Sequence, residues 1–380
     1  MLLLAGLMGV MAIGATAFFG MTGDEDDQDI SPEDMAETGA EGADASGQTG
    51  DGTSIMDVAT SSDPDAAAQD APPGSEPPDN ETVDTAHSGS GDGDSSTGDD
   101  TFETSEGSAG ERIVAGTERD DRIAGTGRVD LINGYEGDDT ISGGGSGDEL
   151  FGRDGEDVLS GDGGDDTLNG DRGDDTLLGG GGQDLLNGHG DDDAIYGGAD
   201  ADTLFGGEGE DSLDGGDGDD VLHGSLGGDD LTGGDGADTV FGGWGNDTIS
   251  GVEQDESGAD TDDRDYLNGG GGDDVILAGA DDIVTTGEGA DRIILGDWLN
   301  EDHQAEILDF SNDEDALMIV YDDTGQGVPE VSFEVDDEDP GKQHVVFNGE
   351  RIAVVTHALA LSQSHVTLIG QSGLGGVMGR

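Results

Sequence analysis

The chain has 380 residues, of which 75 are glycine and 92 are aspartate or glutamate, whereas only 11 are lysine or arginine. Its hydrophobic share is 31 %, against about 45–50 % in ordinary globular domains, which argues against one large globular enzyme. A formal net charge of −81 argues against a nucleic-acid or acidic-membrane partner, because phosphate groups are bound by clustered basic residues. Since there is no cysteine, disulfides and thiolate metal sites are excluded as well.

Residues 1–22 form an apolar segment without a charged side chain, long enough to span a bilayer as a helix. Basic residues usually precede the apolar run of a cleaved signal peptide, and here none occurs before Arg112. Ala15-Thr16-Ala17 nevertheless offers a small-x-small cleavage site. We expect an uncleaved transmembrane anchor; a cleaved signal and a misassigned start are the alternatives.

Residues 23–111 form an acidic region with six of the eight prolines and a single aromatic residue, Phe102. Such a segment buries too little apolar surface to offset the entropy lost on ordering its backbone. We therefore predict a disordered acidic linker, with a tail that binds a basic partner as the alternative.

From Gly116 the sequence repeats every nine residues, and fifteen units follow one another without a gap. With few exceptions, position one is glycine, position six aspartate and position eight a large aliphatic residue. One large aliphatic residue suits the inward-facing position of a short strand, and glycine suits a tight turn. We predict a three-residue strand and a six-residue turn per unit, with two units to a coil, over residues 112–294.

Stacked coils of eighteen residues place position six of each unit beside position six of the unit two further on. One edge of the roll is then predicted to carry Asp121, Asp139, Asp157, Asp175, Asp193, Asp211, Asp229 and Asp247. The other edge is predicted to carry Asp130, Asp148, Asp166, Asp184, Asp202, Asp220 and Asp238. Asp265 and Asp274 hold position six in two later units and complete the predicted set of metal ligands.

These ladders of carboxylates predict bound cations. Neighbouring carboxylates about 5 Å apart in a poorly solvated turn repel one another strongly. Calcium takes six to eight oxygen ligands in irregular geometry, whereas magnesium demands a tighter octahedron. One buried aliphatic side chain per unit offsets too little of the entropy lost by nine ordered residues. We therefore expect many calcium ions and a roll that folds only when it binds them.

Two units, GGEGEDSLD (Gly206–Asp214) and GGDGDDVLH (Gly215–His223), carry the nonapeptide G-G-x-G-x-D-x-U-x almost complete. In this motif the chain resembles the hemolysin-type calcium-binding repeat family, the RTX or repeats-in-toxin proteins. The resemblance implies an all-β fold, a right-handed parallel β-roll that holds calcium in its turns through the position-six aspartates and backbone carbonyls. It also implies an uncleaved C-terminal signal for type I export machinery.

The chain departs from the family pattern at two places. The unit at residues 251–259 has Glu256 at position six and Gly258 at position eight, which predicts a broken calcium edge and a bulging loop. Family members exported by type I systems lack an N-terminal signal, whereas this chain begins with an apolar segment.

Residues 295–380 are predicted to form a small C-terminal β cap, because the last coil of a solenoid needs a cover for its apolar stripe. Strands are predicted over residues 307–310, 316–321, 331–335, 344–347 and 351–355, the last two joined by an Asn348-Gly349 turn. No acidic residue follows Arg351, so a C-terminal export signal is the other interpretation of this segment.

No catalytic motif accompanies the repeats. The seven histidines never form H-E-x-x-H, and no serine stands in a G-x-S-x-G setting. We expect a protein that is not an enzyme and has calcium as its cofactor. Phe151, Phe205 and Phe241 hold position nine of even-numbered units, with Trp244 in a nearby turn. Packing against a loop or the linker explains these aromatics, and a partner-binding stripe is the alternative.

The sequence therefore predicts an extracytoplasmic calcium-binding protein with a structural or interaction role, secreted or held at the cell surface. Its expected partners are calcium ions, a membrane through residues 1–22 only, and type I export machinery; a protein or glycan partner stays unnamed. A secreted RTX effector, either a toxin or a hydrolase, is the first alternative. An acidic calcium buffer at the cell surface is the second.

Overall fold

The computed structural model describes residues 102–108, 110–253, 260, 263–296, 298–324, 329–356 and 361–371. All of them belong to one compact unit, Gly93–Arg380. The predicted anchor at residues 1–22 and almost all of the predicted linker lie outside the described residues. Within these ranges, no helix has the length and apolar character needed to cross a membrane.

The first of two sheets contains every even-numbered strand, together with β1 and β25. Its strands are β1 Glu103–Glu106, β2 Arg112–Ala115, β4 Asp130–Glu136, β6 Glu149–Asp154, β8 Thr167–Arg172, β10 Leu185–Gly190, β12 Thr203–Glu208, β14 Val221–Leu226, β16 Thr239–Trp244, β18 Tyr266–Gly271, β20 Ile283–Glu288, β22 Ala305–Ile307, β24 Val331–Val335, β25 Lys342–Phe347 and β26 Glu350–Thr356. They are ordered β1-β2-β4-β6-β8-β10-β12-β14-β16-β18-β20-β22-β26-β25-β24.

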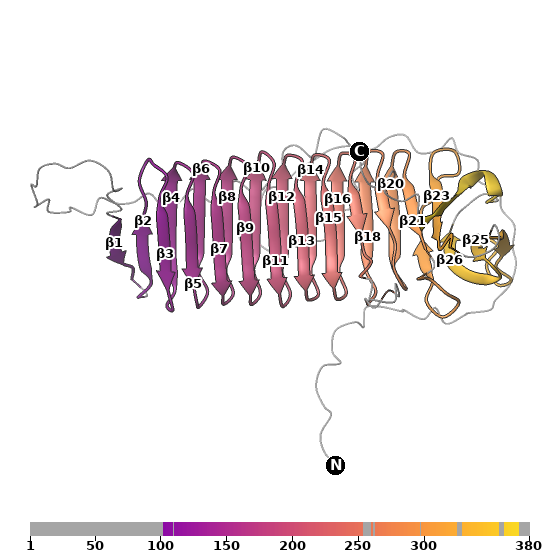
Figure 1. Ribbon diagram of the computed structural model, residues 1–380, viewed down its shortest axis with the longest axis horizontal. Helices are drawn as coiled ribbons and strands as arrows, with labels where there is room; N and C mark the ends of the chain where they lie inside the picture. The colour runs from indigo at the N-terminus through magenta and orange to yellow at the C-terminus, as the bar shows by residue number, and fades with distance from the viewer. Residues whose placement is uncertain are drawn as a thin grey trace, which may run out of the picture. The chain divides into compact units, whose positions relative to one another are not determined.

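The second sheet contains the alternate strands. They are β3 Arg122–Thr126, β5 Thr140–Gly144, β7 Val158–Gly163, β9 Thr176–Gly181, β11 Ala194–Ala199, β13 Ser212–Asp217, β15 Asp230–Asp235, β17 Thr248–Ser250, β19 Val275–Leu277, β21 Arg292–Leu295, β23 Ala316–Tyr321 and β27 Val366–Gly370, the last preceded by a 3₁₀ helix at Gln363–His365. They are ordered β27-β23-β21-β19-β17-β15-β13-β11-β9-β7-β5-β3. From β2 to β23, consecutive strands therefore alternate between the sheets, and neighbours within each sheet of the roll are parallel (Figure 1).

The register confirms the predicted coil of eighteen residues. Leu186 pairs with Leu204, and Leu204 pairs with Leu222, each eighteen residues further on. The strands are longer than predicted: most run for six residues, from position seven of one unit to position three of the next. The prediction of a three-residue strand was wrong because backbone pairing continues beyond the glycine of position one, as in the pairing of Gly207 with Ser225.

The core lies between the two sheets and is built from position eight. Every position-eight aliphatic residue from Ile123 to Ile249 is at most 3 % exposed, and residues from both sheets form one apolar cluster. Side chains on a strand point alternately to its two faces, so positions seven and nine face outward. A typical unit of nine residues thus contributes one apolar side chain to the core.

The sheet bypasses the degraded unit at residues 251–259. No strand is assigned between β17 and β18 in the part of this segment that the structure describes. β16 pairs directly with β18, so that Val240 lies beside Leu267. The sheet therefore skips the insertion and keeps its stack of apolar residues.

The C-terminal segment forms two kinds of structure. β22 and β23 continue the two sheets of the roll by pairing in parallel with β20 and β21. β24, β25 and β26 form the predicted antiparallel cap, and the turn between β25 and β26 has φ of 53° at Asn348 and 93° at Gly349. The strand predicted at residues 307–310 lies earlier, at Ala305–Ile307, and β27 had not been predicted.

Candidate metal centre

The position-six aspartates form two continuous ladders that run along the roll. In each ladder the backbone N–H of one aspartate donates to Oδ1 of the aspartate in the next coil, at N···O distances of 2.6–3.1 Å. The short segment before each strand orients the carboxylate, because position six directly precedes the strand whose position eight is anchored in the core. We call each aspartate a rung of its ladder.

All the predicted ligands belong to these ladders. One contains Asp121, Asp139, Asp157, Asp175, Asp193, Asp211, Asp229, Asp247 and Asp274. The other contains Asp130, Asp148, Asp166, Asp184, Asp202, Asp220, Asp238 and Asp265. The predicted break near Glu256 was wrong for both edges. The ladders bypass the insertion through bonds that span 27 residues, from Asp238 to Asp265 and from Asp247 to Asp274.

Sequence reasoning missed three further rungs. Asp282 follows Asp265, Asp291 follows Asp274, and Asp315 follows Asp291. A signal existed, since each of them stands two residues before a buried aliphatic residue, Val284, Ile293 or Leu317. Spacings of 17 and 24 residues had hidden the pattern.

The second carboxylate oxygen, Oδ2, is the chemically unsatisfied atom of the interior rungs. These side chains are at most 3 % exposed. Their Oδ2 atoms accept no hydrogen bond from the described residues; this holds for Asp139, Asp148, Asp157, Asp166, Asp175, Asp184, Asp193, Asp202, Asp211, Asp220, Asp229, Asp247, Asp274 and Asp291. A buried ionised oxygen without a donor is costly. A cation is the ligand that would compensate it.

Backbone carbonyls share the space beside several of these Oδ2 atoms. A Cβ added at Gly179 would lie 2.5 Å from Asp184 Oδ2 and 2.5 Å from the carbonyl oxygen of Gly197. At Gly197 the corresponding neighbours are Asp202 Oδ2 at 2.6 Å and the carbonyl oxygen of Gly215 at 2.5 Å. Neither glycine has a left-handed φ, so position one requires glycine because oxygens occupy the space of a side chain.

Burial raises the pKa of the interior carboxyls well above the ordinary aspartate value of 3.8. Desolvation is the largest cause, and nearby carboxylates add to it, while the backbone N–H of the preceding rung acts in the opposite direction. The pKa of Asp193 is raised to about 8, that of Asp175 to about 7 and that of Asp184 to about 6. These shifts show that the ladders disfavour negative charge when no cation is bound.

The donor set consists entirely of oxygen. Among the described residues, no group of three or more His, Cys, Asp or Glu side chains gathers at one point. At Asp184 and Asp202, the carboxyl instead shares its space with one main-chain carbonyl of the neighbouring coil. Hard cations prefer such oxygens, and a set supplied by flexible turns fits calcium better than the strict octahedron of magnesium.

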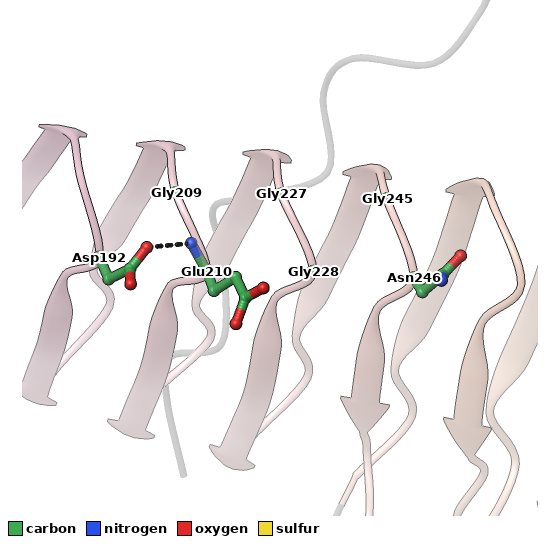
Figure 2. A pocket seen from close by; sticks show the side chains of 7 residues that line it. All are labelled: Asp192, Gly209, Glu210, Gly227, Gly228, Gly245 and Asn246. Carbon is green, nitrogen blue, oxygen red and sulfur yellow. Dashed lines mark hydrogen bonds between the residues drawn. The ribbon is translucent and has the colours of Figure 1, made fainter. Parts of the chain in front are cut away.

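A second row of contacts follows position five on the outer side of the turns. Asp192 Oδ1 accepts a hydrogen bond from the backbone N–H of Glu210 at 2.8 Å (Figure 2). Asp174 accepts similarly from Asp192, and Asn246 from Asp273. A shallow groove of about 670 Å³ runs here, lined by Asp192, Gly209, Glu210, Gly227, Gly228, Gly245 and Asn246. Its carboxylates add negative potential beside the inner ladder.

The comparison with protein families agrees with this geometry. The model of the RTX calcium-binding nonapeptide repeat, which spans four copies, matches residues 115–150, 142–177, 170–204, 196–231, 223–255 and 250–293. Residues 115–293 are RTX calcium-binding repeats. The resemblance seen in the nonapeptides is thereby confirmed, and the repeats form a parallel β-solenoid. No curated protein matches this chain.

The outer face of the RTX roll carries the aromatic side chains singled out from the sequence. Phe205 and Phe241 stack on the two faces of His223, with ring centroids 5.0 and 4.8 Å apart. Phe151 lies apart from this stack, under the guanidinium of Arg153 at 4.6 Å. Trp244 is 51 % exposed. The stripe thus stabilises neighbouring coils by stacking, and Trp244 is its most accessible ring.

Proposed function

We propose that this protein is an extracytoplasmic calcium-dependent scaffold, whose right-handed β-roll folds by binding many calcium ions along both aspartate ladders. The buried Oδ2 atoms of the interior rungs named above carry this proposal, because they combine carboxyl oxygen, burial and lack of a donor among the described residues. Calcium supplies the compensating positive charge. The chain's own part is to hold each carboxylate by its Oδ1 and to present carbonyl oxygens beside Oδ2.

The proposed role is structural and involves no catalysis. The interior rungs hold neighbouring coils together through their hydrogen bonds. The turns outside them carry carboxylates such as Asp192 and Glu210 rather than a nucleophile beside a base. An acidic buffer would bind calcium without a change of fold. A scaffold instead gains its β structure as calcium binds.

Far-UV circular dichroism of the full chain, titrated with calcium, tests the proposal. We expect a cooperative gain of β signal at about 10⁻⁴–10⁻³ M calcium, the range of extracellular modules, and a much smaller gain with magnesium. Equal β content in excess chelator would refute the scaffold and leave the buffer.

The same folding requirement supports a location outside the cytoplasm. Cytosolic calcium lies far below the affinity expected of extracellular modules, so the roll would stay unfolded before export. Protease added to intact cells in calcium buffer should leave a resistant fragment that begins near Gly116. Cleavage of the roll only after cell lysis would contradict the proposed location.

A further inference from the structure

The first rung of each ladder differs from the interior rungs in the partners of its Oδ2. Asp121 Oδ2 accepts a hydrogen bond from the backbone N–H of Thr117 at 2.6 Å. Asp130 Oδ2 accepts from both the N–H and the Oγ1–H of Thr126, at 2.6 and 2.9 Å. The oxygen that lacks a donor in the interior rungs is therefore already satisfied by protein at the start of both ladders.

The conformation of the turn accounts for this difference. Interior units have a left-handed residue at position two, such as Tyr135 or His189 with φ of 83°, and another at position four, such as Gly137 with φ of 113°. Thr117 and Thr126, at position two of the first two units, are not left-handed. Without this bend the position-two N–H faces the aspartate of its own unit and donates to it.

The sequence carries the corresponding signal at position four. The first two units have Arg119 and Arg128 there, whereas most interior units have glycine. Arg119 and Arg128 have no left-handed φ, whereas position four of the interior turns has one, whether it holds glycine or a short polar residue such as Ser146 or Asp191. Arginine at position four therefore accompanies the two turns that satisfy their own aspartate.

Arg112 supplies a cation to the first rung of the even ladder. The register of β2 on β4 places Arg112 beside Asp130, at position six of one further coil, and Val114 fills position eight of that coil at 2 % exposed. Arg112 Nε donates to Asp130 Oδ1 at 2.7 Å. The carboxylate of Asp130 is fully buried, so this ion pair neutralises its charge where solvent cannot.

The last rungs show the same satisfaction by protein donors. Asp282 Oδ2 accepts from the backbone N–H of Gly279 at 2.6 Å. Asp315 Oδ2 accepts from the N–H of Ser311 at 2.7 Å, and Thr286 Oγ1 lies 3.3 Å from the same oxygen. Both ladders thus begin and end on carboxylates that need no metal for their Oδ2.

We propose that calcium is confined to the interior rungs, and that the chain's own donors replace it at Asp121, Asp130, Asp282 and Asp315, with Arg112 as the built-in cation of the first coil. The strand after Asp121, β3, is the edge of its sheet and pairs with β5 alone, so a calcium site there would lack the carbonyls of a further coil. Internal donors close the ladders at both ends instead. This inference rests on the calcium binding proposed above.

Bound calcium per molecule of the full chain, measured by equilibrium dialysis at saturating calcium, tests the assignment. Asp130→Asn should retain the parent's number of bound ions, whereas the matched interior variant Asp184→Asn should lose at least one. Equal losses in the two variants would overturn this inference while leaving the scaffold intact. A parent chain that binds no calcium would overturn both proposals.

A second variant keeps the test informative if Asp130→Asn fails to fold. Arg112→Gln should keep the parent's calcium number but increase amide hydrogen exchange in β2 by at least about tenfold, even at saturating calcium. Arg172→Gln, which removes an exposed ion pair with Asp154, is the matched control and should exchange like the parent. Unchanged protection of β2, or one fewer bound calcium in Arg112→Gln, would refute the role of Arg112.

Discussion

The repeat units and the antiparallel cap reach a buried core by different means. A repeat strand such as β9 buries one aliphatic residue, Leu177, and Gly179 two residues later. In the cap, β25 buries five consecutive residues from Gln343 to Phe347, and β26 adds Ile352, Ala353 and Val355. The cap therefore buries far more apolar surface per residue than the roll does. The roll instead buries one carboxyl group per unit.

This difference shows which part of the fold depends on its environment. Apolar burial stabilises a structure without any ligand, so we expect the cap to be stable without calcium. The buried carboxylates of the roll oppose folding until a cation neutralises them. Experiments that vary the cation or the proton should therefore separate the two regions.

Calcium removal should have the largest effect and should affect the roll alone. In excess chelator we expect amides of the interior strands, for example β9 to β14, to lose hydrogen-exchange protection by several orders of magnitude, because the Oδ2 atoms lose their counter-charge. Amides of β25 and β26 should stay protected, since three antiparallel strands with an apolar face can persist alone. Simultaneous loss of protection in both regions would show that the cap depends on the roll.

The pH dependence should have opposite signs with and without calcium. Folding raises the pKa of the interior carboxyls from 3.8 to about 6–8, so the calcium-free folded state binds more protons than the unfolded state between these values. Its stability is therefore greatest below about pH 4 and is lost as the pH rises toward 8. With calcium, protons compete for the same oxygens, and acid should weaken the fold.

Two measurements at pH 5 and pH 8 give the two pH dependences: the β signal by circular dichroism in chelator, and urea unfolding followed by circular dichroism in calcium. The cap offers an internal contrast, because hydrogen bonds from His344 and from backbone amides lower the pKa of Asp336 to about 2. A chelated roll that is more stable at pH 8 than at pH 5 would contradict the assignment of buried, donor-poor carboxylates.

A single rung should have a smaller effect, which depends on its place. Asp184→Ala should raise the calcium midpoint of folding on the order of tenfold, as expected when a group at a metal site is removed. Asp260→Ala should change it much less, because Asp260 lies outside both ladders and accepts from the backbone N–H groups of Ala280 and Glu253. Equal midpoints for the two variants would count against the ladder assignment.

The period of nine was sufficient to predict the coil, its inward residue and the ladders, because each column has one physical role that every unit repeats. It could not predict that both ladders continue past residues 251–259, since pairing between coils, rather than spacing along the chain, decides which aspartates meet. The period also could not predict the ion pair of Arg112 with Asp130, because an arginine at position six contradicts the pattern that defines a unit. The strand length was underestimated because glycine at position one was assigned to the turn, although its backbone pairs within the sheet.

The smallest expected effect concerns that glycine and tests space rather than charge. In Gly197→Ala, the new Cβ would lie 2.5 Å from the carbonyl oxygen of Gly215 and 2.6 Å from Asp202 Oδ2, so both oxygens must move away from the candidate site. We expect the calcium midpoint to rise a few-fold, since overpacking typically costs about 1–3 kcal/mol and only one site is disturbed. Gly181→Ala is the matched control, because nothing lies within 4 Å of its added Cβ and its φ is not left-handed. Its midpoint should equal that of the parent. If both variants respond alike in a calcium titration followed by circular dichroism, position one requires glycine for chain flexibility, and the shared oxygen space beside Asp202 is not a calcium site.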